Sequence, residues 1–386
     1  FANDAERGVF ILAFFLLVVG GSLTLFALRA PVVKGSAGFG LLSRETLLLG
    51  NNILLTIIMI MVLLGTLYPL VADALSLGKI SVGPPYFNLF FLPLMGLLCL
   101  LMAFGPLSNW KRTSGMQFIK LLWKPWAISL AFALAFPLFY REKYEILAAL
   151  TVFIASWVFT ALIADLIYRL RNSDSFLSGF KKLSLSYFAM VVAHAGIAVT
   201  TVGVGLTSIY TEQRDVRMEV GQKVTVVEFD FILNKLSHID GPNYTAEEAL
   251  ITVMKDGKFL REMKPQKRRY LASGSTMTEV ALDVGFFRDL YVAMGEPLTE
   301  TAWAMRVHLK PFVRWIWLGA LMMAFGAVLA VADKRYRKVV KQESPAKNVP
   351  AGKLVNEQAA IFFVCALNYF CCIGNPVLAR AFIKSK

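Results

Sequence analysis

The sequence predicts an all-α polytopic membrane protein that carries one small, mostly β extracytoplasmic domain. Hydrophobic residues make up 57% of the 386 residues, charged residues make up only 17%, and the mean hydropathy is +0.59. Soluble globular proteins have about 45–50% apolar and about 25% charged residues. Seven long apolar segments and a single long polar segment, 211–310, account for this composition.

A membrane-spanning helix needs about 20 predominantly apolar residues. The segments of that length are Gly8–Leu28, Asn51–Ala72, Tyr86–Gly105, Leu121–Tyr140, Tyr144–Ile167, Leu183–Tyr210 and Phe312–Val331. An eighth run, Ala359–Leu378, is interrupted by Asn368, Asn375 and Pro376 and is a weaker candidate. We therefore expect six spanning helices in 1–210, a periplasmic β-rich domain in 211–310, a seventh helix in 311–337 and a cytoplasmic tail of uncertain origin in 338–386.

The net charge of +14 lies beside the apolar segments. The polar segment 211–310 holds 14 Lys and Arg residues against 15 Asp and Glu residues, so it is almost neutral. Basic and neutral loops alternate along the rest of the chain, and basic loops are retained in the cytoplasm. This alternation places Phe1 and 211–310 on the outer side. A nucleic-acid binder would concentrate its charge on a polar domain, so nucleic acid is disfavoured as a partner.

The polar segment has the pattern of antiparallel strands. The runs Lys223–Phe231 and Ala249–Met254 are rich in β-branched and aromatic residues. Asp-Gly within Lys255–Lys258 favours a two-residue hairpin turn, because these residues tolerate positive φ, and Gly241–Asn243 predicts another turn. Gly203-Val-Gly lies inside an apolar helix, where helix packing is the expected role.

The cysteines give no indication of a disulfide framework or a metal site. Cys99, Cys365, Cys371 and Cys372 show no CxxC or Cys/His spacing, which supports neither a disulfide framework nor a zinc site. The chain begins at Phe1 without a signal-peptide pattern, so we expect a fragment or a mature portion of something longer. No Ser/His/Asp or Cys/His nucleophile arrangement can be assembled, so no catalytic residue is assigned and hydrolysis is disfavoured.

His194 is the residue most able to carry chemistry, because it lies near the middle of the sixth predicted span. An ionisable group at that depth usually faces a cavity, a partner or a cofactor. Its neighbours Ala193, Ala195, Gly196 and Ala198 are small enough for a helix or a flat macrocycle to approach the backbone. Three interpretations stay open on these grounds: a haem ligand, a proton-relay group, or a hydrogen bond to another helix.

The other candidates have ordinary explanations. His238 precedes a turn and is expected to be a solvated loop residue, and His308 is expected to pack at the membrane interface. In Lys310–Trp317 the tryptophans suit the interface, and the basic side chains can reach lipid phosphates. Alternatively, Arg314 or Lys310 pairs with an anionic ligand such as a haem propionate. Asp165 is expected to reach the interface or to pair with Arg169, and Lys267-Arg-Arg is expected to be a solvated loop.

Several long motifs resemble the second half of the CcmF family, the membrane haem lyase subunits of bacterial cytochrome c maturation. The matching motifs are Phe1–Gly8, Phe26–Ala30, Ser43–Asn52, Val192–Gly196, Arg214–Met218, Gly241–Tyr244, Met277–Glu279, Arg288–Glu296 and Lys310–Trp317. The resemblance runs to about Arg337 and does not include Ala359–Lys386. The family's tryptophan-rich haem-handling segment and its other haem-contacting histidines belong upstream.

The resemblance implies a part in attaching haem covalently to the Cys-x-x-Cys-His motif of apocytochrome c, at the outer face of the bacterial inner membrane. The implied partners are the haem chaperone CcmE, a CcmH-type protein that holds the apocytochrome, apocytochrome c itself, membrane lipid and the missing upstream half. It also implies a membrane haem b, and His194 matches one of its two axial ligands. A haem lyase component is thus the leading hypothesis. The rivals are a transporter for haem or another anionic substrate, against which no inverted repeat is evident, and a non-catalytic assembly scaffold.

Overall fold

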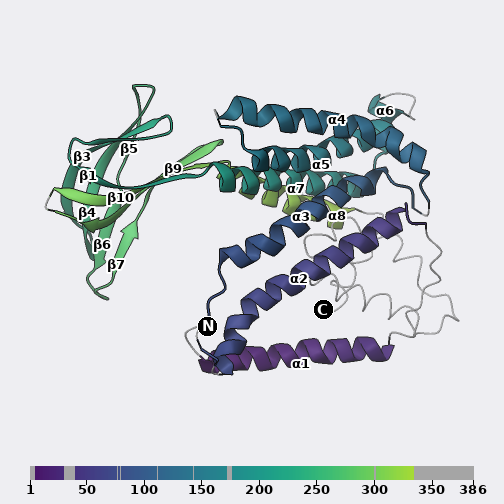
Figure 1. The fold of residues 1–386 in the computed structure, drawn as a ribbon, viewed down its shortest axis with the longest axis horizontal. Coiled ribbons are helices and arrows are strands. Elements are labelled where there is room, and N and C mark those ends of the chain that lie inside the picture. The colour runs from purple at the N-terminus through teal and green to yellow at the C-terminus, as the bar shows by residue number, and fades with distance from the viewer. Residues whose placement is uncertain are drawn as a thin grey trace. The chain divides into compact units, whose positions relative to one another are not determined.

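The structure, a computed structural model, describes residues 5–29, 40–75, 77–78, 80–110, 112–141, 143–171, 176–299 and 301–333. Within these ranges seven helices are long and apolar enough to cross a membrane. They are α1 (Ala5–Arg29), α2 (Arg44–Ala74), α3 (Pro84–Leu107), α4 (Gly115–Tyr140), α5 (Ile146–Arg171), α7 (Leu185–Tyr210) and α8 (Val313–Ala332) (Figure 1). A short helix, α6 (Phe176–Lys182), lies between α5 and α7. The predicted eighth apolar run, Ala359–Leu378, and the tail 338–386 lie outside the described residues.

Helix α2 begins earlier than its apolar run, because local capping extends it to Arg44. The Ser43 hydroxyl accepts the backbone N–H of Thr46 at 3.2 Å, which satisfies one of the unpaired donors of the first turn. The Arg44 side chain donates to the carbonyls of Gly105 (3.1 Å) and Pro106 (3.2 Å) in the last turn of α3. A cation at a helix C-terminus is favourable, so Arg44 fixes the start of α2 against the end of α3.

The described chain forms two compact units. One contains the β domain with the adjoining ends of four helices, in Ala133–Val152 and Val199–Ala320. The other contains α1, α2, α3 and the remaining parts of α4, α5, α7 and α8. In the second of these, α3, α4 and α5 pack through Ala103, Leu107, Leu122, Trp157 and Ala161.

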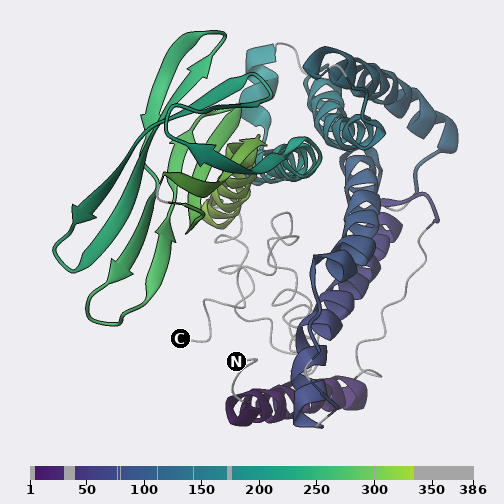
Figure 2. The ribbon, with the colours of Figure 1, turned by 60° about the vertical axis from the view of Figure 1, so that its left-hand side comes forward.

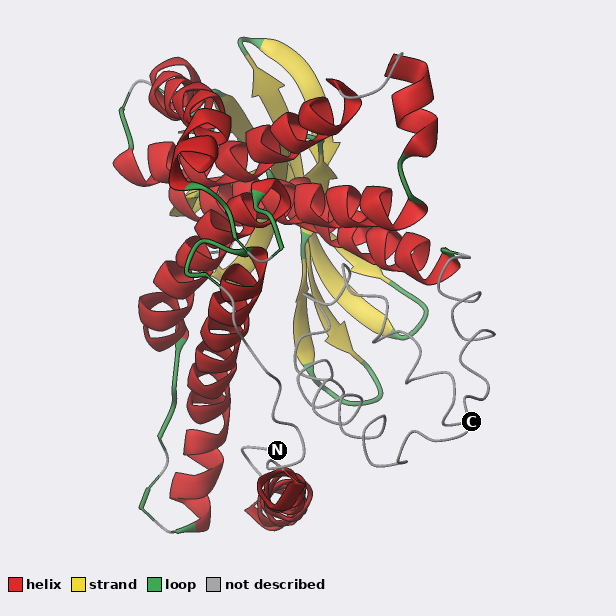
Figure 3. Ribbon diagram, turned by 90° about the vertical axis from the view of Figure 1, so that its right-hand side faces the viewer, coloured by secondary structure: helices red, strands yellow, loops and turns green. Residues whose placement is uncertain are grey.

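All strands of the described chain belong to one β domain (Figure 3). They are β1 (Glu212–Glu219), β2 (Lys223–Val226), β3 (Phe229–Asp240), β4 (Tyr244–Lys255), β5 (Lys258–Met263), β6 (Gln266–Tyr270), β7 (Thr276–Glu279), β8 (Ala281–Val284), β9 (Arg288–Pro297) and β10 (Ala302–Pro311). One sheet has the order β1-β10-β9-β8, and the other has the order β2-β3-β4-β6-β7 with β5 paired to β4 (Figure 2). Every pairing is antiparallel. The predicted fold class, a polytopic membrane protein with one small β domain, is confirmed.

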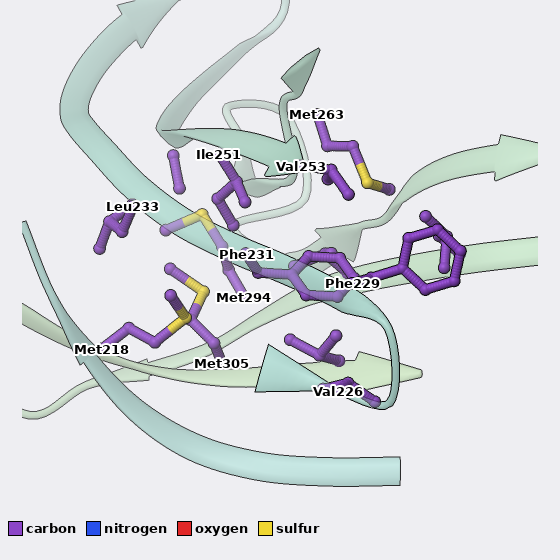
Figure 4. Close-up of a cluster of buried hydrophobic side chains, with 14 of the residues drawn as sticks. Met218, Val226, Phe229, Phe231, Leu233, Ile251, Val253, Met263, Met294 and Met305 are labelled. Carbon is purple, nitrogen blue, oxygen red and sulfur yellow. The ribbon is translucent and has the colours of Figure 1, made fainter. Parts of the chain in front are cut away.

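The two sheets enclose an apolar core (Figure 4). Alternate residues of β3 and β4 point inward, including Phe229, Phe231 and Leu233 from β3, and all three are fully buried. From the other sheet β10 supplies Met305, which is also buried. Period-two burial of this kind is the reason that the β-branched and aromatic runs form strands.

The predicted turns are present, but three expectations were wrong. Asp256 (φ 50°) and Gly257 (φ 73°) form the β4–β5 hairpin turn as predicted. The run Lys223–Phe231 is not one strand, because the chain reverses at Val227 (φ 58°) to form the β2–β3 hairpin. His238 lies on β3 and Lys267-Arg-Arg lies on β6, so neither is in a loop; strand pairing with β4 places both.

The glycines of α7 serve helix packing, as predicted. A Cβ at Gly203 would lie 2.6 Å from the backbone nitrogen of Ile316 in α8, and one at Gly205 would collide with Thr151 of α5. Small residues let membrane helices approach closely. Near the end of α7 the Thr207 hydroxyl donates to the Pro311 carbonyl at 2.6 Å, which fixes this helix end against the last residue of β10.

Candidate functional site

His194 projects from α7, and its ring is held by its own helix. Nδ1 lies 2.9 Å from the carbonyl oxygen of Met190, one turn earlier. A carbonyl can only accept, so Nδ1 carries the proton and the lone pair of the neutral imidazole is on Nε2. Within the described part of the chain no hydrogen-bond partner contacts Nε2. The side chain is partly exposed on this unit of the protein. This tautomer, fixed by a backbone acceptor, is the one in which Nε2 can bind a metal.

The small residues around His194 have divided roles. A Cβ at Gly326 of α8 would lie 2.8 Å from the Ala189 carbonyl and 3.0 Å from the Ala193 Cβ. Ala189 and Ala193 therefore receive α8, which is the ordinary packing role of small residues in membrane helices. Direct hydrogen bonding of the imidazole to another helix, one of the three interpretations, is not what the described residues show. The ring has an open nitrogen instead.

A buried ionic cluster joins α5 to the start of α7. Asp165 is 2% exposed, and its carboxylate accepts the Arg169 Nε at 3.1 and 2.9 Å and the Tyr187 hydroxyl at 2.8 Å. The Arg169 guanidinium lies 4.7 Å from the centroid of the Tyr187 ring. The expected pairing of Asp165 with Arg169 is present, whereas Tyr187 had no signal in the sequence. The Asp165 carboxylate accepts from both Arg169 and Tyr187, so the cluster stabilises the contact between α5 and α7.

Arg314 is on the first turn of α8 and is half exposed. Its Nε lies 4.0 Å from a carboxylate oxygen of Asp289, a distance that makes a loose ion pair. Asp289 also accepts the backbone N–H of Gly285 at 3.1 Å, so the carboxylate is held in place while the guanidinium keeps unused donors. Arg314 and His194 belong to different compact units.

The pKa values of the two histidines of the β domain are shifted in opposite directions. The carboxylate of Glu247, 2.7 Å from Nδ1, raises the pKa of exposed His238. Burial, followed by the charges of Lys310 and Arg306, lowers the pKa of His308. His308 lies on β10 against the ring of Tyr291, and within the described chain its buried Nδ1 has no hydrogen-bond partner. His308 is thus a packed imidazole that stays neutral at pH 7, and its place at the membrane interface stays a prediction.

No multidentate metal site is present in the described ranges, since nowhere do three or more His, Cys, Asp or Glu residues cluster. Any metal held by these residues would therefore take no more than two of them as ligands. His194 meets that requirement, because one imidazole suffices as one axial ligand of a haem iron.

Comparisons with known proteins decide the family. Residues 209–311 match a family model described as the CcmF C-terminal beta-sandwich. The cytochrome c-type biogenesis protein CcmF of Pseudomonas aeruginosa is 51% identical over 88% of this chain and 52% of its own length. The protein of the same name from Escherichia coli is 44% identical over 91% of this chain and 53% of its own length. The chain is a member of the CcmF family.

The chain spans about half the length of the curated CcmF relatives that it matches. A solved structure titled cytochrome c heme lyase CcmF aligns with a TM-score of 0.64 over 82% of this chain and 49% of that one. At 21% identity this likeness speaks for the fold alone. The matched β-sandwich coincides with the domain from β1 to β10. The seven long apolar helices of the described residues indicate a multi-pass membrane protein.

Proposed function

We propose that this chain is the second half of a haem-handling component of cytochrome c maturation, a haem lyase that helps attach haem to the Cys-x-x-Cys-His motif of apocytochrome c. The proposal places it in the bacterial inner membrane with 211–310 in the periplasm. The partners that the proposal names are the haem chaperone CcmE, a CcmH-type protein, apocytochrome c and the upstream half of the same protein. Membership in the CcmF family supports this role.

One observation carries the cofactor part of the proposal. Among the described residues Nε2 of His194 has no hydrogen-bond partner, and the Nδ1 bond to Met190 leaves the lone pair on Nε2, near the middle of a membrane helix. Together with a second ligand from elsewhere, His194 would hold a haem b within the membrane. Bound there, the haem would supply a redox-active iron. The backbone bond keeps the ring in one orientation and raises the basicity of Nε2. Arg314, with donors left over from its loose pair with Asp289, is the weaker candidate for a propionate.

The attachment reaction itself asks little of protein side chains. Each thioether forms when a cysteine S–H of the substrate adds across a vinyl C=C of the substrate haem. The sulfur bonds to one carbon and the hydrogen goes to the other, so nothing is oxidised or reduced in the addition. The requirements are reduced iron and fixed geometry, which agrees with the lack of a nucleophile–base pair among the described residues. We assign to the β domain the task of holding the apocytochrome or a partner.

The test is a reduced-minus-oxidised visible spectrum with a haem-to-protein ratio, measured for wild type, His194→Ala and His238→Ala. His238 is the matched control, because it removes an exposed imidazole from the β domain. All three proteins are purified with and without the co-expressed upstream half. The proposal expects haem b bands in wild type and His238→Ala and their loss in His194→Ala. Equal bands in all three proteins would remove His194 from the site.

The same experiment tests the alternative functions, a transporter and an assembly scaffold. A transporter or an assembly scaffold would purify without a Soret band even when the upstream half is present. That result would overturn the haem-handling proposal for this chain.

A further inference from the structure

The turn between β8 and β9 carries two exposed aromatic side chains. Phe286 is 55% exposed and Phe287 is 60% exposed, although they are consecutive and large. On the preceding strand Leu282 and Val284 are also exposed and share one sheet face, since alternate residues point the same way. Exposed contiguous apolar surface of this kind marks an interaction site.

This turn is rigid. The N–H of Gly285 donates to a carboxylate oxygen of Asp289 at 3.1 Å, and Arg288 pairs with Asp283 on β8. The Phe287 carbonyl accepts the N–H of Phe312 at 3.0 Å. The two rings are therefore held out by a fixed backbone.

Their position along the membrane normal follows from α8. Phe312 immediately precedes α8, whose 20 residues rise about 30 Å, the thickness of the hydrocarbon core. The start of α8 must then lie at the edge of that core. Phe286 and Phe287 pack against Trp315 in the first turn, with ring centroids 5.7 and 6.2 Å apart. The turn is thus level with the membrane interface.

The surroundings have the chemistry of a lipid contact. Trp317, on the same part of α8, is 70% exposed, and aromatic residues concentrate at membrane interfaces. Arg314 beside the turn is half exposed and only loosely paired, so its guanidinium can reach a lipid phosphate. We propose that the β8–β9 turn is a membrane-interface anchor, in which Phe286 and Phe287 insert between phospholipid headgroups and seat the β domain on the bilayer.

The test places an environment-sensitive fluorophore on single cysteines in a chain whose four native cysteines are replaced by Ser. The reporter positions are Phe287→Cys and Phe286→Cys. The control is Leu271→Cys, a similarly exposed apolar position in the β6–β7 hairpin, at 66% exposure. β9 begins beside the end of α7, because Arg288 pairs with Pro311 and the Pro311 carbonyl accepts from Thr207. In Figure 1, β6 and β7 end in a hairpin away from it. The labelled chains are reconstituted in phosphatidylethanolamine–phosphatidylglycerol vesicles with and without lipids that carry a shallow doxyl quencher.

The anchor predicts blue-shifted emission at Phe287→Cys and Phe286→Cys, with loss of fluorescence when doxyl lipid is present. Leu271→Cys should show neither effect. Emission that is blue-shifted but not quenched would mean that protein covers the turn, which overturns the proposal. Water-like emission at both reporter positions, equal to that of Leu271→Cys, would overturn it as well.

Discussion

Two buried tyrosines of α7, Tyr187 and Tyr210, differ in whether the hydroxyl group has a hydrogen-bond partner. The hydroxyl of Tyr187 donates to the buried carboxylate of Asp165 at 2.8 Å. The hydroxyl of Tyr210 is buried and, among the described residues, has no partner. Tyr→Phe removes the same atom at both positions and keeps the ring. Tyr187→Phe should therefore lower the stability, whereas Tyr210→Phe should leave it nearly unchanged or raise it slightly.

Two typical hydrogen-bond energies bracket the expected loss of stability in Tyr187→Phe. Hydrogen bonds to charged groups contribute about 1.5–3 kcal/mol in soluble proteins, whereas interhelical bonds in membranes average about 0.6 kcal/mol. Asp165 is almost inaccessible and keeps its Arg169 partner in the variant, so the carboxylate loses one of its partners and not all. We expect a loss of about 1–1.5 kcal/mol, close to the top of the membrane range. Removing the unpaired hydroxyl of Tyr210 should cost about 0 kcal/mol or stabilise slightly.

Equilibrium unfolding in mixed micelles, with increasing denaturing detergent and far-UV circular dichroism as the signal, measures both effects. A loss of 1.4 kcal/mol corresponds to about a tenfold change in the folded-to-unfolded ratio, well above the resolution of a midpoint shift. The Phe ring preserves the stacking of Arg169, so the difference isolates the hydroxyl group. Equal midpoints for the two variants, or a larger loss for Tyr210→Phe, would refute the reasoning.

Three further predictions each concern a single residue. Because the pKa of His308 is lowered in the folded state, the unfolded state binds the proton first. Stability should thus be complete above about pH 6.5 and fall as the pH drops toward the folded pKa; unfolding midpoints at about pH 7.5 and about pH 5.5 should differ less for His308→Gln than for wild type. Gly203→Val should destabilise by about 1–3 kcal/mol through its collision with Ile316, while Gly21→Val, which meets nothing within 4 Å, should leave the midpoint unchanged. Gly257→Val should cost about 1–2 kcal/mol, because its φ of 73° disfavours a side chain, and hydrogen exchange should show the loss in the β4–β5 hairpin.

The sequence predicted those features that depend on periodicity and length. Apolar runs of about 20 residues locate spanning helices whatever their packing, because the bilayer sets the length. The Asp256-Gly257 turn was predictable, since few other pairs tolerate two positive φ angles. His194 was also identifiable, because an ionisable residue in an apolar span stands out from its surroundings.

Other features depend on contacts between residues distant in sequence. The contact of Arg44 with carbonyls 61 and 62 residues later, which fixes the start of α2 against the end of α3, is encoded by no local pattern. The reversal at Val227 was missed because β-branched residues favour strands, and only pairing of β2 with β3 reveals the hairpin. The bond from His194 to Met190 has no sequence signal at all, because every residue offers the same backbone carbonyl.

Helix α7 combines features that the local sequence predicts with features that depend on contacts between distant residues. Its first turns are fixed by the Tyr187–Asp165 bond, its middle presents the His194 ring, and its later turns carry Gly203 and Gly205 at close helix contacts. For the haem ligation proposed above, a helix fixed both before and after His194 would keep the ring in place. The bond to Met190 restrains the ring itself. Under that proposal, Gly203→Val, remote from the imidazole, should lower the haem-to-protein ratio because it loosens α7, whereas Gly21→Val in α1 should leave the ratio unchanged.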